Sequence, residues 1–172
     1  IAVYGSIIHA MTHPRLRNLA RYLALEYGAL TDLAYAAAVG SIPLMEICWD
    51  QGMLDPAKAY HRYRPPKHQR VNPSNAFILG EALIYAAITG RLEATKWLLS
   101  KGAAPEVVAP IHEEYPNALQ AAIWGNWPEV VQYLLEQQAN PHQTDPVHQS
   151  DAMGWATFLN RPQLIPIIQS FL

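Results

Sequence analysis

One pattern of small, turn-forming and apolar residues returns four times along this chain, and it limits the folds that the chain can adopt. The pattern is clearest from Asn117 to Pro141, where two apolar segments flank a Gly-Asn turn. The first segment contains the small pair Ala121 and Ala122. Pro128 stands where a second helix would begin, a position that needs no backbone N–H. Because an apolar stripe at helical spacing follows, the segment predicts two short helices that pack as a pair.

The same offsets recur when this segment is compared with the rest of the chain. Matching units begin at Thr31, Glu81, Asn117 and Asp151, with successive spacings of 50, 36 and 34 residues. Each unit has glycine or asparagine after its first helix, the residues that most readily adopt a positive φ; they are Gly40, Gly90, Asn126 and Asn160. Since each helix pair has an apolar face that it cannot bury alone, the neighbouring pairs must cover it. The pattern therefore predicts an all-α solenoid of stacked helix-turn-helix units.

The motif N-A-L-Q-A-A at residues 117–122 resembles the T-P-L-H-x-A-A opening of an ankyrin repeat, in the variant found in large fungal ankyrin proteins. The resemblance implies about four repeats, at residues 31–55, 81–110, 117–145 and 151–172, and a degenerate N-terminal cap at residues 1–30. The first spacing exceeds the family period of about 33 residues by roughly 17. We therefore expect residues 56–80 to be a loop insertion, and residues 1–172 to form a single ankyrin-repeat domain.

The second helices carry the apolar residues that should hold the stack together. Leu134 and the single cysteine, Cys48, fall on their apolar stripes and are expected to be buried. Asn117 and Asp151 stand where first helices begin and are expected to act as N-caps. Four residues share one offset and are predicted to form a continuous buried ridge between the two helix layers: Ile47, Trp97, Tyr133 and Ile167.

The composition argues against several classes of protein. The formal net charge is −2, which argues against a chain whose main role is to hold nucleic acid. A single cysteine excludes an internal disulfide framework and favours an intracellular setting, cytoplasmic or nuclear. No apolar run approaches the roughly 18–20 residues that a membrane-spanning helix needs. The chain begins with Ile and has no signal-peptide pattern, so we expect a monomeric segment of a larger polypeptide.

The ankyrin resemblance also implies a function, which is to bind a protein or peptide partner in the concave groove formed by the first helices and the finger loops. The groove positions combine aromatic side chains with arginines, which are enriched in binding hot spots. Two alternatives stay open: Trp124 and Trp127 could pack only on each other and on adjacent repeats, and the chain could be a structural spacer in a larger protein. The predicted partner-binding residues are Ile88, Thr89, Arg91, Trp124, Trp127, Phe158 and Arg161.

The loop insertion offers a different candidate site. It carries basic residues with interleaved tyrosines and histidines and no acidic residue from Pro56 to Gly80. Basic and aromatic side chains together can hold phosphates and stack bases, so an anionic ligand such as a nucleic acid or phosphate is one interpretation. The other is a solvated loop, or one that docks on an acidic neighbour. The basic residues are Lys58, Arg62, Arg64, Lys67 and Arg70.

Neither catalysis nor metal binding is predicted. The chain has no G-x-S-x-G, P-loop or dinucleotide motif, so we expect no catalytic residues and no cofactor. His142, Asp145, His148 and Asp151 recur every three residues, a spacing that could suggest a metal site. Prolines at positions 141 and 146 break this segment into a loop, where residues three apart do not share a face. A zinc site needs three or four converging ligands, and the segment is not expected to supply them.

Overall fold

The computed structural model of the chain describes residues 33–50, 74–109, 111, 114 and 116–172. In this part the helices come in four consecutive pairs, and the only strand-like pairing is an isolated bridge between Ile111 and Glu114. The pairs are α3 (Leu33–Val39) with α4 (Ile42–Asp50), α6 (Asn75–Ile88) with α7 (Leu92–Ser100), α8 (Ala118–Gly125) with α9 (Pro128–Glu136), and α10 (Ala152–Phe158) with α11 (Ile165–Gln169).

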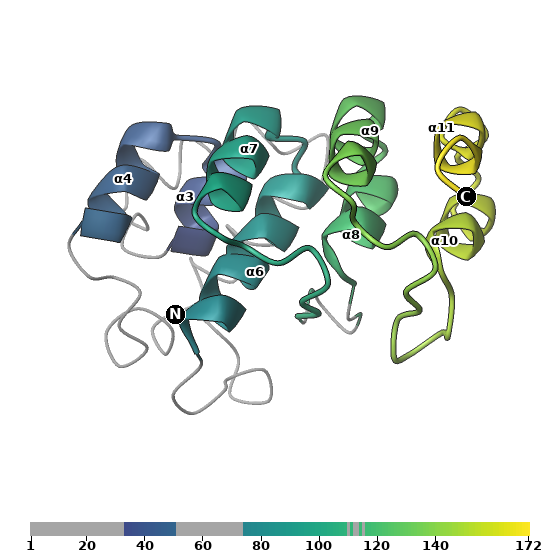
Figure 1. Ribbon diagram of the computed structural model, residues 1–172, viewed down its shortest axis with the longest axis horizontal. Coiled ribbons are helices and arrows are strands. Elements are labelled where there is room, and N and C mark those ends of the chain that lie inside the picture. The colour runs from purple at the N-terminus through teal and green to yellow at the C-terminus, as the bar shows by residue number, and fades with distance from the viewer. Residues whose placement is uncertain (1–32, 51–73, 110, 112–113, 115) are drawn as a thin grey trace, which may run out of the picture.

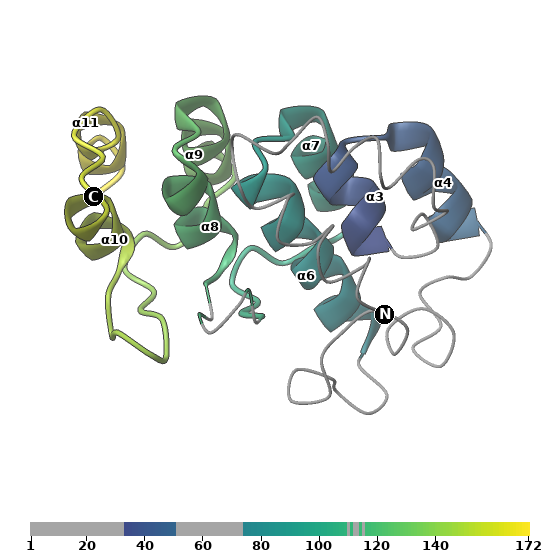
Figure 2. The ribbon, with the colours of Figure 1, turned by 180° about the vertical axis from the view of Figure 1, so that it is seen from behind.

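The helix pairs stack side by side in two layers. Viewed from opposite sides, the first helices α3, α6, α8 and α10 follow one another in one layer, and α4, α7, α9 and α11 form the other (Figures 1 and 2). The loops from α7 to α8 and from α9 to α10 both project on the side of the first helices (Figure 1). We call these two connections the finger loops. This arrangement confirms the predicted all-α repeat solenoid.

Capping side chains set where the first helices begin. The Asn117 side chain accepts a hydrogen bond from the backbone N–H of Gln120 at 2.9 Å, and the Gln120 side chain accepts one from the backbone N–H of Asn117 at 2.9 Å. This reciprocal pair is a capping box. It supplies acceptors to two backbone N–H groups that have no acceptor within the helix. Asp151 caps α10 by accepting a hydrogen bond from the backbone N–H of Gly154 at 2.8 Å. Both predicted N-caps are confirmed.

The turn inside each helix pair requires a residue with a positive φ, as the sequence predicted. The four turn residues have φ angles between 53° and 78°. Glycine adopts this conformation without steric cost, and asparagine is the side chain that tolerates it best. The turn residues are Gly40, Gly90, Asn126 and Asn160.

The predicted loop insertion extends too far toward the C-terminus. Helix α6 begins at Asn75, and the Ser74 side chain caps it by accepting a hydrogen bond from the backbone N–H of Phe77 at 3.2 Å. The apolar residues Phe77–Leu79 are buried in the core, which stabilises these additional turns of helix. Residues 75–80 therefore belong to α6. The remainder of the insertion and the predicted cap at residues 1–30 lie outside the described residues.

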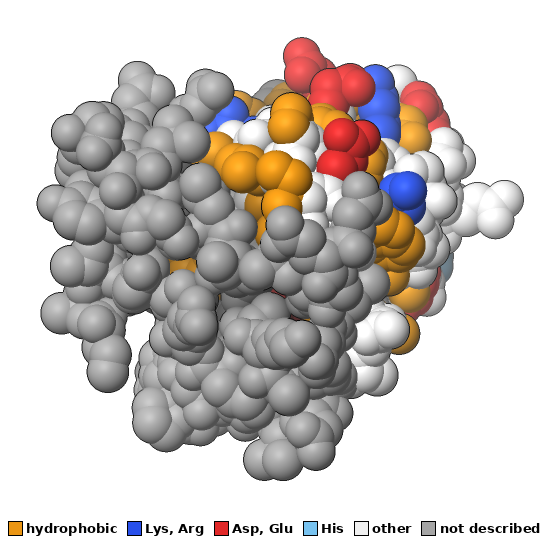
Figure 3. Space-filling model, turned by 90° about the vertical axis from the view of Figure 1, so that its left-hand side faces the viewer, with side chains coloured by type: hydrophobic (Ala, Val, Ile, Leu, Met, Phe, Trp, Pro, Cys, Tyr) orange, Lys and Arg blue, Asp and Glu red, His pale blue; other side chains and the backbone are white. Residues whose placement is uncertain are grey.

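The predicted ridge of Ile47, Trp97, Tyr133 and Ile167 is wrong. Ile47 is 47% exposed and the other three are only partly buried, because this offset faces the outer side of the second helices. Figure 3 faces the α4 end of the stack and shows hydrophobic side chains exposed there. One residue further along a helix turns the side chain by about 100°, into the space between the layers. The residues at that next offset are at most 1% exposed and form the ridge: Cys48, Leu98, Leu134 and Ile168.

Candidate partner-binding site

Two of the predicted partner-binding residues are buried inside the stack. Ile88 is 4% exposed and Thr89 is 1% exposed. The Thr89 hydroxyl donates a hydrogen bond to the Tyr85 carbonyl oxygen at 2.7 Å, which satisfies the buried side chain within its own helix. Neither side chain is presented at the surface of the folded chain.

Three other predicted residues tie each helix pair to the preceding pair. Each follows the turn residue directly and donates a side-chain hydrogen bond to a carbonyl oxygen at the end of the preceding first helix. Carbonyls in the last turn of a helix have no partner within the helix, so these bonds satisfy them. The bonds run from Arg91 Nε to Ala38 O at 3.1 Å, from Trp127 Nε1 to Ile88 O at 3.0 Å, and from an Arg161 terminal nitrogen to Trp124 O at 3.3 Å.

The indole of Trp127 occupies space that two glycines leave open. A Cβ atom at Gly90 would lie 2.4 Å from a carbon of the ring, and one at Gly125 would lie 2.4 Å from its nitrogen. Real Cβ atoms do not approach other heavy atoms so closely. The ring therefore packs directly on the backbone at both positions, and only glycine, which has no Cβ atom, leaves room for it. Trp127 therefore packs on the preceding repeat, which is one of the alternatives that the sequence left open.

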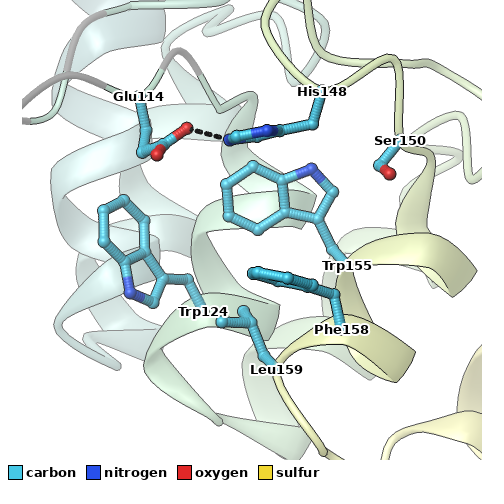
Figure 4. A pocket seen from close by; sticks show the side chains of 7 residues that line it. All are labelled: Glu114, Trp124, His148, Ser150, Trp155, Phe158 and Leu159. Atoms are coloured by element: carbon cyan, nitrogen blue, oxygen red, sulfur yellow. Dashed lines mark hydrogen bonds and ion pairs between the residues drawn. The ribbon is translucent and has the colours of Figure 1, made fainter.

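The last two predicted residues line a pocket between α8 and α10. The Trp124 ring lies 5.9 Å from the ring of Trp155, which is almost fully buried, whereas Phe158 is 85% exposed. The cavity has a volume of about 190 Å³. We call it the aromatic pocket, and its lining residues are Glu114, Trp124, His148, Ser150, Trp155, Phe158 and Leu159 (Figure 4).

A polar pair from the two finger loops borders the aromatic pocket. His148 Nε2 and Glu114 Oε2 are 2.6 Å apart, and both side chains are partly exposed (Figure 4). The His148 ring also packs edge-on against the Trp155 ring, with an interplanar angle of 72° and 6.2 Å between the centroids. The pair therefore joins consecutive finger loops at the edge of the aromatic surface.

Asp145 organises the loop that carries His148. Its Oδ1 accepts hydrogen bonds from the backbone N–H groups of Val147 at 2.9 Å and His148 at 2.6 Å. Its Oδ2 accepts from the Ser150 backbone N–H at 3.1 Å and from Trp155 Nε1 at 2.9 Å. Burial raises the pKa of the carboxyl, but these hydrogen bonds outweigh burial and bring the pKa below the usual value for aspartate. The ionised carboxylate thus fixes both His148 and Trp155 at the pocket.

Sequence reasoning missed Glu114, Asp145 and Trp155 as parts of one site. Asp145 precedes a proline in a short polar loop, a pattern typical of an Asx turn, and that signal could have identified its role. Its carboxylate oxygens are already engaged by four hydrogen bonds. No group of three or more potential metal ligands occurs among the residues that the structure describes. The predicted anion-binding residues, Lys58, Arg62, Arg64, Lys67 and Arg70, lie outside that part of the chain.

The fold and the pocket define a helical repeat protein with an aromatic pocket between α8 and α10. A family model described as ankyrin repeats in three copies matches residues 33–145, and the chain belongs to the ankyrin repeat family. Ankyrin repeats are generally protein–protein interaction modules and are typically non-enzymatic. No curated protein matches the sequence significantly. Within the described residues, no helix is both long and apolar enough to span a bilayer.

Proposed function

We propose that this chain recognises a protein partner by binding a peptide segment in the aromatic pocket. Phe158 carries the proposal, because it is 85% exposed directly beside a hollow lined by two tryptophans. Burying a phenylalanine side chain against a partner contributes roughly 1.5–3 kcal/mol, so the exposed ring is a favourable contact for a ligand. Aromatic residues also dominate the energetics of protein interfaces.

The pocket disfavours a purely structural spacer. A spacer needs no recognition surface, and its exposed groove positions would carry scattered polar side chains. In this chain the ends of α8 and α10 instead present Trp124, Phe158 and Leu159 to one cavity. Phe158 is exposed and Trp124 and Leu159 are half-buried, and a concave site lined by accessible apolar side chains is typical of ligand recognition.

The experiment that tests this function is a selection from a displayed peptide library followed by affinity measurements with two matched variants. Phe158→Ser removes an exposed aromatic side chain at the pocket, and Ile47→Ser removes an exposed apolar side chain on the outer face of α4. We expect selected peptides to bind Phe158→Ser at least roughly ten-fold more weakly, and Ile47→Ser as well as the wild type. Peptides that bind Phe158→Ser with unchanged affinity would contradict the proposal.

A further inference from the structure

We propose that the aromatic pocket accepts an arginine side chain from a basic segment of the partner, an inference that rests on the proposed function. Three kinds of observation carry it: the net charge of residues 102–172, the aromatic side chains around the cavity, and the single carboxylate among the described residues that line it. Of the side chains that a peptide can present, the guanidinium group of arginine fits all three observations.

The charge distribution favours a cationic ligand at this end of the stack. Residues 102–172 contain seven acidic residues and one basic residue, Arg161, which gives this segment a formal net charge of −6. The Arg161 side chain donates a hydrogen bond to the Trp124 carbonyl oxygen, so the one basic side chain of this segment joins two neighbouring helix pairs. A segment with such an excess of one sign attracts ligands of the opposite sign and raises their association rate. The acidic residues are Glu106, Glu113, Glu114, Glu129, Glu136, Asp145 and Asp151.

The aromatic side chains provide surfaces on which a planar cation can stack. Trp124 and Phe158 come from the ends of α8 and α10, and Trp155 lies below His148 and above Phe158 in the view of Figure 4. The face of an indole or phenyl ring carries negative electrostatic potential and attracts cations. A guanidinium group is flat and weakly hydrated, so it stacks on such faces at a small desolvation cost. The aliphatic part of the arginine side chain would lie against Leu159.

Glu114 distinguishes arginine from other occupants. Among the described residues that line the pocket it is the only acidic one, and its Oε2 already contacts His148. Among the described residues, nothing donates a hydrogen bond to its other oxygen, Oε1. A guanidinium group can stack on a ring and donate to a carboxylate at its edge at the same time, whereas the lysine ammonium is a point charge. An apolar side chain would cover the carboxylate without giving it a donor, which is unfavourable.

The test titrates the ¹⁵N-labelled wild-type protein with three small probes and follows the indole N–H signals of its five tryptophans. The probes are N-acetyl-arginine methylamide and its lysine and norleucine counterparts, which share a backbone and differ in the side-chain head. We expect arginine to shift the Trp124 and Trp155 signals at lower concentration than lysine does, and norleucine to bind most weakly. Single Trp→Phe variants assign the signals.

Two variants with the same loss of charge test the role of the carboxylate. Glu114→Gln removes the charge at the pocket, and Glu129→Gln removes one from an exposed position on α9. We expect Glu114→Gln to weaken arginine binding roughly five-fold and Glu129→Gln to leave it unchanged. Norleucine binding as tightly as arginine, or no response of the Trp124 and Trp155 signals to arginine, overturns the inference. The peptide selection with Phe158→Ser decides separately whether the pocket binds a partner at all.

Discussion

Replacing Gly90 by alanine should weaken the contact between the second and third helix pairs that the structure describes. Gly90 has a φ of 71°, and an added Cβ atom would lie 2.4 Å from the indole of Trp127. The ring would have to move, and its hydrogen bond to the Ile88 carbonyl oxygen, 3.0 Å long, would be lost. The substitution therefore perturbs both the turn and the neighbouring repeat.

The expected loss of stability has a backbone part and a contact part. Alanine in the left-handed conformation costs roughly 1–2 kcal/mol. The lost hydrogen bond costs about 0.5–1.5 kcal/mol, and an indole forced away from its preferred rotamer about the same again. The chain also supplies a matched control, because Gly102 has a φ of 89° and nothing lies within 4 Å of an added Cβ atom. Gly102→Ala should therefore show the backbone part alone.

Urea denaturation followed by far-UV circular dichroism measures both variants against the wild type. We expect Gly90→Ala to lose about 1–3 kcal/mol more than Gly102→Ala, the sum of the two contact terms. Equal losses in the two variants would show that Trp127 does not brace the stack through Gly90, and would refute this explanation of the tryptophan.

Three further predictions concern the core and the finger loop. Leu134→Ala should lower the free energy of unfolding by about 2–5 kcal/mol in a urea titration, since Leu134 is fully buried. Ile47→Ala should cost less than Leu98→Ala in the same assay, because Ile47 is 47% exposed and Leu98 is fully buried; equal costs would restore the ridge that the sequence predicted. Asp145→Asn should destabilise by about 1–3 kcal/mol at neutral pH, because an amide in place of one oxygen leaves two of the four N–H donors without an acceptor. Since the folded-state pKa of Asp145 is lowered, its stabilisation is present above the usual aspartate pKa and is lost as the pH falls through the lowered value. Melting temperatures measured down to strongly acidic pH should therefore converge for the wild type and Asp145→Asn, and a constant difference would contradict this.

Much of the fold could be predicted from sequence because each repeat needs the same kinds of residue, such as a turn residue with a positive φ, at the same offset. Asn126 and Asn160 could be recognised as turn residues because they stand where other repeats have glycine, and both adopt a positive φ. The start of α6 is not predictable from the repeat pattern, because the pattern begins at Glu81 and the additional helical residues before it have no counterpart in the other repeats. The buried ridge was misplaced by one residue because the apolar stripe of the second helices is wide enough to include both offsets.

The candidate site was only partly predictable, since most of its contacts join residues that are distant in sequence. Trp124 and Phe158 were identified because the ends of first helices line the groove in the ankyrin family. The acceptors of Arg91 and Trp127 are backbone carbonyls 53 and 39 positions away. Because every residue has a backbone carbonyl, the residue type does not indicate which one accepts the hydrogen bond. Glu114 and His148 are 34 positions apart in different finger loops, so only the fold shows that they meet.

Hydrogen–deuterium exchange with and without a selected peptide tests most directly whether the aromatic pocket is the recognition site. We predict that the peptide slows exchange in α10 (Ala152–Phe158), at the end of α8 and in the finger loop at residues 142–150, while α4 and α7 exchange as before. Slower exchange confined to α4 and α7, with no change around Trp124 and Phe158, would contradict a partner-binding role for this pocket.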